Sequence, residues 1–346
     1  MPDQKREPYL SIVAASRNDN HGGDMLKRMR VFVAGLIHQC NAYKLPCELI
    51  MVEWNPIESQ QLLNEILPAP AKDDYLTIRY IQVPPAIHET LAFSKQIPLF
   101  QMIAKNVGIR RATANFVLCT NIDILFSDAL FKNLAKRNLQ QNCFYRANRC
   151  DVPGTLDENW PIKQQLEFCR NNIVKRLGKN PLYANFKSTS GFLFKHKLFK
   201  PALMLLAKIK AGYATSVKDR FDTLDLDACG DFTLMDKKSW IDIQGYPELE
   251  IYSIHIDSMG VIAAAALNKQ QVIFKDNECC YHMEHAGGWE FKTPIDKIHF
   301  YTKKPMLDWW SVREAGLYLM EKKTTYNLNE NNWGFSDTVL QEIVLP

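Results

Sequence analysis

Short apolar segments alternate with amphipathic segments over the first 126 residues, and this alternation limits the folds open to the chain. Four segments have the length and apolar character of buried strands: Leu10–Ala15, Cys47–Val52, Leu76–Val83 and Asn115–Cys119. Helices are predicted between them, at Met25–Cys40, Ser59–Leu67 and Pro98–Ala112. Such alternation with short loops is typical of a mainly parallel sheet covered by helices, so we predict an α/β fold.

The fourth predicted strand runs directly into a polar pair, Asn121 and Asp123, set within an otherwise apolar segment. In open α/β sheets, ligands bind beyond the carboxyl ends of the strands. A carboxylate at that position can hold a divalent cation that in turn binds phosphate oxygens. The same pair is also compatible with an ordinary turn, because Asn and Asp commonly start one.

The composition is that of an ordinary globular protein. The chain has 346 residues and a formal net charge of +4, with 42 basic and 38 acidic residues. This charge is too small, and the basic residues are too scattered, to predict binding of a nucleic acid. A small phosphate-bearing ligand agrees better with the sequence.

Two common phosphate-binding loops are missing. No GxGxxG pattern follows the first predicted strand, and no GxxxxGK[ST] pattern occurs anywhere. The chain contains only 15 glycines. We therefore expect phosphate groups to be bound through a metal ion and not by a glycine-rich loop.

The cysteines and the hydropathy pattern bear on location. Nine cysteines are present, none in a CxxC pair, and we interpret them as reduced thiols of a cytoplasmic protein. The adjacent pair Cys279 and Cys280 suits packing in a strand better than metal binding. No segment has the apolar length of a transmembrane span, and peripheral contact with a membrane remains compatible with the sequence.

The second half of the chain is less regular. We expect helices at Pro161–Leu177, Leu198–Lys210 and Asp257–Asn268, and strands at Phe144–Ala147, Phe232–Met235, Gln271–Phe274 and Cys280–Met283. A hairpin or turn is expected near 188–191. The predicted organisation is one domain over 1–300, made of a first half (8–150), a helical insertion (151–227) and a second half (228–300). Residues 301–346 would form a helix and an arm packed on that domain.

The order of the motifs resembles that of GT-A nucleotide-sugar glycosyltransferases of the large family-two type. The residues that carry the resemblance are Ser16-Arg17-Asn18, Glu53, the segment 104–110 (AKNVGIR), Asn121-Ile122-Asp123, the segments 230–235 and 245–248, and His255-Ile256-Asp257. The segment 281–285 (YHMEH) is similar to the late metal-histidine strand of the related galactosyl- and N-acetylgalactosaminyltransferases. The resemblance extends over roughly residues 8–290. It implies that 8–150 is the nucleotide-sugar-binding half, that the insertion 151–227 lies on the acceptor side, and that 228–300 is the acceptor and catalytic half.

The resemblance implies a role for each matching residue. The nucleotide-sugar would be contacted by Ser16, Arg17, Asn18, Glu53, Asn106, Arg110 and Asn121. Asp123 matches the last acid of the DXD motif, and Asn121 replaces the first acid. Asp257 matches the base that deprotonates the acceptor hydroxyl, and Asp231 lies in an acceptor-binding segment. Glu53 stands where the family usually has Asp, which leaves the identity of the nucleotide open.

The chemistry of transfer agrees with these roles. Asp123 with His285 or His282 would hold Mn²⁺ or Mg²⁺, which neutralises charge on the departing diphosphate. Asp257 would take the proton of a glycan or lipid-linked acceptor hydroxyl, so that one displacement inverts the anomeric centre. The donor would be a UDP- or GDP-sugar. Because alternate strand residues point to opposite faces, we expect only one histidine to be a ligand, and we favour His285, which precedes the flexible segment 286–288.

Structural interpretations and rival functions stay open. Asp257 also suits the N-cap of its helix, Glu53 a solvated turn, His282 an ordinary buried histidine, and Trp309-Trp310 either packing or a sugar platform. A nucleotidyltransferase shares this sheet order but requires a glycine-rich, arginine-containing loop after the first strand, which residues 16–19 do not supply. A non-catalytic sugar- or nucleotide-binding module with a degenerate site is the second rival.

Overall fold

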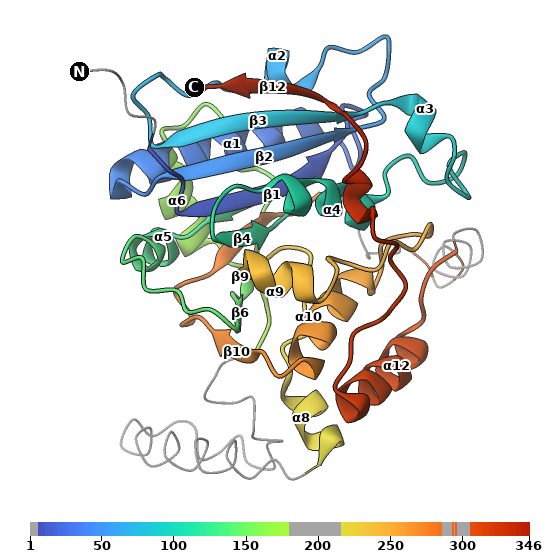
Figure 1. Ribbon diagram of the computed structural model, residues 1–346. Coiled ribbons are helices and arrows are strands. Elements are labelled where there is room, and N and C mark those ends of the chain that lie inside the picture. Colours follow the sequence, from blue (N-terminus) through green and yellow to red (C-terminus); the bar gives the residue numbers. More distant parts are fainter. Residues whose placement is uncertain (1–5, 180–215, 286–292, 294, 296–304) are drawn as a thin grey trace, which may run out of the picture.

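A large mixed sheet forms the centre of the molecule (Figure 1). The computed structural model describes residues 6–179, 216–285, 293, 295 and 305–346. The eight strands of this sheet are, in spatial order, β10 (Gln270–Ile273), β6 (Cys143–Arg146), β9 (Thr233–Asp236), β4 (Phe116–Cys119), β1 (Leu10–Ser16), β2 (Cys47–Trp54), β3 (Leu76–Val83) and β12 (Gln341–Leu345). Strands β4, β1, β2 and β3 run parallel, as does the pair β6 and β10. The predicted α/β class with a mainly parallel sheet is confirmed.

Helices cover both faces of this sheet. The helices are α1 (Met25–Tyr43), α2 (Leu63–Ile66), α3 (Pro85–His88), α4 (Gln101–Arg111), α5 (Asp128–Leu134), α6 (Ile162–Asn171), α8 (Val217–Thr223), α9 (Lys237–Asp242), α10 (Ile256–Ala266) and α12 (Trp309–Lys322), with the 3₁₀ turn η3 (Trp333–Phe335). Neighbouring residues of β1 enter different cores. Ile12 packs in the cluster that contains Phe32 of α1, and Val13 packs in the cluster that contains Val107 of α4. Burial of both faces explains why these strands are apolar throughout.

A second sheet of four strands brings distant parts of the chain to the end of β4. Its order is β5 (Ile124–Phe126), β11 (Cys280–Met283), β7 (Arg149–Val152) and β8 (Lys175–Leu177). Strand β11 pairs antiparallel with β5 and parallel with β7. The register sets His282 opposite Ile124 and Asp151. Asp123, which directly precedes β5, therefore lies beside the carboxyl end of β11.

Several predicted elements differ from those observed. The helix expected over 161–177 ends at Asn171, and its last part is β8, which pairs with β7. The region 151–227 is therefore not wholly helical in its described part. The helix expected at 59–67 covers only Leu63–Ile66. The helix expected at 198–210 and the hairpin near 188–191 lie outside the described residues.

The C-terminal arm completes the large sheet. After α12 the chain passes η3 and ends in β12, which pairs antiparallel with β3 at the sheet edge (Figure 1). Arg79 of β3 makes ion pairs with Glu342 of β12 (2.6 Å) and with Glu48 of β2 (2.9 Å). The arm therefore covers a strand edge that would otherwise expose its hydrogen-bonding groups. No helix within the described ranges is long and apolar enough to cross a membrane.

Helix α4 packs so closely on β1 that Gly108 has no space for a side chain. A Cβ at this position would lie 2.4 Å from Val13 Cγ1. We expect Gly108→Ala to lower the free energy of unfolding, because overpacking costs about 1–3 kcal/mol and outweighs the gain of about 1 kcal/mol in helix propensity. Urea unfolding measures the change. Gly108→Ala should cost less stability in a Val13→Ala background than in the parent, because the smaller side chain leaves room for the new Cβ. A Gly108→Ala variant as stable as the parent would show that the contact relaxes freely.

Candidate functional site

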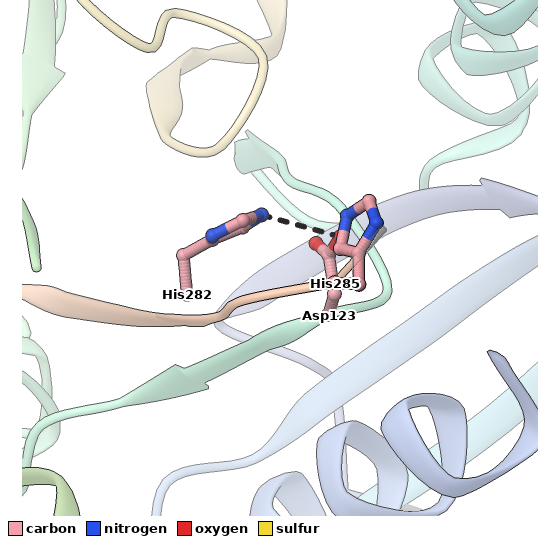
Figure 2. Close-up of side chains that lie close together, drawn as sticks. All are labelled: Asp123, His282 and His285. Atoms are coloured by element: carbon pink, nitrogen blue, oxygen red, sulfur yellow. Dashed lines mark hydrogen bonds and ion pairs between the residues drawn. The ribbon is translucent and has the colours of Figure 1, made fainter. Parts of the chain in front are cut away.

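Three side chains from separate segments meet beyond the end of β4. Asp123 Oδ2 lies 3.1 Å from His285 Nε2 and 3.4 Å from His282 Nε2 (Figure 2). One ligand atom from each of these residues lies within 4.8 Å of the others. Asp123 and His282 are buried, and His285 is partly exposed. The three residues have the separation and the access expected of a metal site.

The donor set fits a divalent cation. Asp123 Oδ1 is buried and has no hydrogen-bond partner, so a carboxylate lone pair is left unused. Two imidazoles and one carboxylate suit a first-row transition-metal ion, whereas Mg²⁺ prefers oxygen ligands and water. Of the two ions expected from the sequence, Mn²⁺ is the transition metal, and Asp123, His282 and His285 would therefore suit it better than Mg²⁺.

Positive charges compensate the buried Asp123 carboxylate. Arg28 of α1 is buried, and its NH1 lies 3.4 Å from Asp123 Oδ2. The same guanidinium donates to the carbonyl oxygens of His21 and Gly23 and so holds the segment after β1 against Asp123. Burial would raise the pKa of Asp123, but the two histidines outweigh it and hold that pKa well below its usual value. Asp123 is therefore a carboxylate and available as a ligand.

His282 is oriented from behind by another carboxylate. Its Nδ1 lies 3.2 Å from Asp151 Oδ1, and Arg149 pairs with the same oxygen at 2.5 Å. Burial would lower the pKa of His282, but Asp123 and Asp151 raise it to about 10. A carboxylate behind a ligating histidine is the usual support of metal sites, because it fixes the ring and raises its basicity.

We expected only one histidine to be a metal ligand, yet both histidines lie close to the same oxygen of Asp123. The alternation of a strand applies to His282, which lies in β11, but β11 ends at Met283. Beyond that residue the chain leaves the strand direction, and His285 reaches the same carboxylate oxygen from another side (Figure 2). The glycine-containing segment 286–288, which was the reason to favour His285, lies outside the described residues.

Asp257 lies at the start of α10, partly exposed. Its Oδ2 accepts from the Gly230 backbone N–H (2.6 Å), and its Oδ1 accepts from the Ser258 N–H (2.9 Å). The N-cap is His255, whose φ is 64°, so the alternative that Asp257 is the N-cap is wrong. Burial raises the pKa of Asp257, and nearby Lys105 opposes the shift. A carboxylate with a raised pKa is a stronger base than an ordinary surface aspartate.

Of the residues at and after the end of β1 that were predicted to contact the nucleotide, one is buried and two are accessible. Ser16 is buried and donates to Met29 Sδ (3.2 Å), so its hydroxyl is used in packing. Arg17 donates to the Asn55 carbonyl oxygen (2.8 Å), and Asn18 donates to that of Gln61 (3.0 Å). Both side chains connect the loops after β1 and β2 and remain partly exposed.

Glu53 is a buried carboxylate at the end of β2, not a solvated turn residue. It is 1% exposed, Oε1 accepts from the Leu63 N–H (3.0 Å), and Oε2 has no hydrogen-bond partner. Burial raises the pKa of Glu53 to about 7. A carboxyl group half-protonated near neutral pH can both donate and accept a hydrogen bond, which suits recognition of a base or ribose.

The contacts of Asn106 and Arg110 favour structural roles over the predicted ones near the diphosphate. Asn106 is fully buried and binds the backbone of Tyr246 through both ends of its amide (2.8 Å each). It thereby holds the loop before α10. Arg110 lies over the Trp333 ring at 4.6 Å and donates to the Asn331 carbonyl oxygen (3.3 Å).

Asn121 and Asp231 are hydrogen-bonded to each other. Asn121 Nδ2 donates to Asp231 Oδ1 (2.6 Å), and Arg149 NH1 contacts Asp231 Oδ2 (3.0 Å). Arg149 also pairs with Asp151, which contacts His282, so a continuous set of polar contacts joins His282 to Asp231. The prediction missed Arg28, Arg149 and Asp151. The buried strand β7, which carries Arg149 and Asp151, gave no recognisable pattern.

Comparison with known proteins gives modest similarities to solved structures. No family model and no curated protein sequence matches the chain. GalNAc-T7, crystallised with UDP, GalNAc and Mn²⁺, is similar with a TM-score of 0.42, 9% identity and coverage of 82% of this chain and 45% of that one. Residues 1–349 of S. aureus TarS, in complex with UDP-GlcNAc, are similar with a TM-score of 0.43 and 12% identity, over 91% of this chain and 72% of that one. Another S. aureus TarS structure has a TM-score of 0.38 and 13% identity, over 85% of this chain and 38% of that one. The chain spans less than half of the GalNAc-T7 structure.

The donor set predicts the effect of two substitutions on metal binding. Asp123→Ala should abolish Mn²⁺ binding measured by calorimetry, and Asp151→Asn should weaken it by about 10- to 100-fold, because the support behind His282 is lost. His38→Ala, on the outer part of α1, is the matched histidine control and should change nothing. Unchanged Mn²⁺ affinity in Asp123→Ala would refute the site.

Burial of Glu53 predicts a dependence of stability on pH. Because its pKa is raised from 4.5 to about 7, the unfolded state ionises first, and stability should fall as pH rises from about 4.5 to 7. The loss is at most about 3.5 kcal/mol, since one pKa unit corresponds to about 1.4 kcal/mol. Glu53→Gln keeps the acceptor for Leu63 and should remove this part of the pH dependence. Urea unfolding at pH 5 and pH 8 measures the change in the free energy of unfolding. An equal change in the parent and in Glu53→Gln would contradict the assignment.

Proposed function

We propose that this chain is a glycosyltransferase that depends on a divalent metal and moves a sugar from a nucleotide-sugar to a hydroxyl acceptor. The observation that carries the proposal is the cluster of Asp123, His282 and His285 beyond the carboxyl ends of the parallel strands. Asp257, a carboxylate with a raised pKa, is joined to the same region through Gly230 and Asp231. A metal-binding cluster and a separate base are the two groups that this transfer requires.

The three metal-binding residues would act on the donor side. A divalent ion held there supplies positive charge for the diphosphate of the donor. Arg28 adds a fixed positive charge beside Asp123, and its contact with the segment after β1 keeps that segment close to the site. Glu53, Arg17 and Asn18 lie at the ends of β1 and β2, where a nucleoside would extend from that diphosphate.

Asp257 would act on the acceptor side. Its carboxylate takes the proton of the acceptor hydroxyl while that oxygen forms a bond to the anomeric carbon. The bond from the anomeric carbon to the diphosphate oxygen breaks in the same displacement, and the nucleoside diphosphate leaves with the electron pair. The backbone N–H groups of Gly230 and Ser258 fix the carboxylate in orientation. One direct displacement by this arrangement inverts the configuration of the sugar.

The assignment of the base predicts a selective loss of turnover. Asp257→Asn should reduce release of nucleoside diphosphate from a UDP- or GDP-sugar, with Mn²⁺ present and water as acceptor, by about 10²- to 10⁴-fold. Donor affinity should not change, because Asp257 does not contact the metal-binding residues. Asp219→Asn, an exposed aspartate of α8, is the control and should behave as the parent.

Two outcomes would contradict this account. Turnover equal to that of the parent in Asp257→Asn would refute the role of the base. If no UDP- or GDP-sugar raises the thermal unfolding midpoint in the presence of Mn²⁺, the proposal of a nucleotide-sugar enzyme fails as a whole.

A further inference from the structure

Lys105 is a fully buried lysine close to the site, on α4. It is 0% exposed, and its Nζ donates to Asn121 Oδ1 (2.7 Å) and to the Gly230 carbonyl oxygen (2.9 Å). A lysine is almost never buried completely without paired groups, because an ammonium loses much of its solvation energy there. These contacts therefore call for a functional explanation, and they lead to Asn121.

Asn121 uses both ends of its amide. Its Oδ1 accepts from Lys105 and from Gln101 Nε2 (2.8 Å), while its Nδ2 donates to Asp231 Oδ1 (2.6 Å). An amide can accept from an ammonium and donate to a carboxylate at the same time, whereas a carboxylate can only accept. An aspartate at 121 would place two carboxylate oxygens at hydrogen-bond distance with no donor between them, so the hydrogen bond to Asp231 would be replaced by repulsion.

These contacts also separate Asn121 from the metal-binding residues. The amide oxygen of Asn121, the atom that could act as a ligand, already has an ammonium 2.7 Å away. A divalent cation bound to that oxygen would be strongly repelled by Lys105 at such a distance. The missing first acid of the DXD motif is therefore not simply a ligand that was lost.

Gly230 connects this arrangement to Asp257. Its carbonyl oxygen accepts from Lys105, and its N–H donates to Asp257 Oδ2 (2.6 Å). A Cβ at Gly230 would lie 3.2 Å from Asp257 Oδ2 and 3.6 Å from Asn121 Nδ2, so the glycine sits directly between them. A shift of Asn121 or Lys105 would thus move the group that orients Asp257.

We propose that Lys105, Asn121, Gly230 and Asp231, here named the Lys105 junction, are positioning residues that fix Asp257 relative to the segment carrying Asp123. Asn121 is an amide because the junction requires one. The assignment of Asp257 as the oriented base rests on the proposed function, whereas the requirement for an amide at 121 rests on the hydrogen bonds alone.

Asn121→Asp tests the junction against the view that the motif is degenerate. If Asn121 were a lost ligand, restoring the acid should tighten Mn²⁺ binding measured by calorimetry. The Lys105 junction predicts that Mn²⁺ affinity does not increase. It also predicts that the midpoint of thermal unfolding falls, because the new carboxylate at 121 and that of Asp231 repel each other. Tighter Mn²⁺ binding with an undiminished unfolding midpoint would overturn the proposal.

A reciprocal exchange provides the matched control. In Asn121→Asp with Asp231→Asn, the new amide at 231 donates to the carboxylate at 121 and still accepts from Arg149, and the net charge is that of the parent. The unfolding midpoint of the double variant should return most of the way from that of Asn121→Asp to that of the parent. If the double variant instead lowers the midpoint by the sum of the decreases caused by Asn121→Asp and Asp231→Asn alone, the junction is refuted. If Asn121→Asp fails to fold, recovery of folding in the double variant is the same test.

Kinetic measurements on Asn121→Asp and on the parent test the Lys105 junction and the proposed function separately. In Asn121→Asp, kcat for donor hydrolysis should fall while the donor KM stays near that of the parent, because Asp257 is displaced and the metal-binding residues are not. A rise in KM with unchanged kcat would overturn the positioning role. If the parent itself shows no turnover, the proposed function fails, and the calorimetry and unfolding results still decide whether Asn121 must be an amide.

Discussion

The structure of the site depends on the compensation of a buried carboxylate. Asp123 lies at the junction of the two sheets, where burial alone would favour its neutral form. Arg28 from α1, His282 from β11 and His285 beyond β11 approach one of its oxygens, while the other oxygen has no partner. Breaking such a buried arrangement is costly, because the remaining charge is left unpaired. The carboxylate thus holds three distant segments together and keeps one lone pair free for a cation.

A second polar cluster, around Lys105, is proposed to position Asp257. Its ammonium holds the end of β4 and the segment before β9 together, and the Gly230 N–H passes this constraint to Asp257. Arg149 links the two centres through Asp151 and Asp231. In this account Asp123 and the proposed base Asp257 belong to one hydrogen-bonded framework, although they are more than a hundred residues apart in the sequence.

Local patterns predicted the sheet and the position of Asp123, because strand length and apolarity depend on neighbouring residues alone. The resemblance of the motif order to GT-A glycosyltransferases, and not a local pattern, placed His282, His285 and Asp257 among the candidate residues. Local patterns failed where a partner is distant in sequence. Arg28 lies off the apolar stripe of α1, which indicates exposure, yet its guanidinium is buried against Asp123. Asn106 matched a nucleotide-binding position, but its amide binds Tyr246. The short strands β5, β7 and β8 gave no periodic signal that separates them from loops.

Anomalous diffraction from crystals soaked in Mn²⁺, recorded at the manganese edge, tests the central claim most directly. The account predicts an anomalous peak within coordination distance of Asp123, His282 and His285, with the Asn121 side chain still bonded to Lys105 and Asp231. A peak bound to Asn121, or the absence of any peak at these three residues in crystals that bind Mn²⁺ elsewhere, would contradict it.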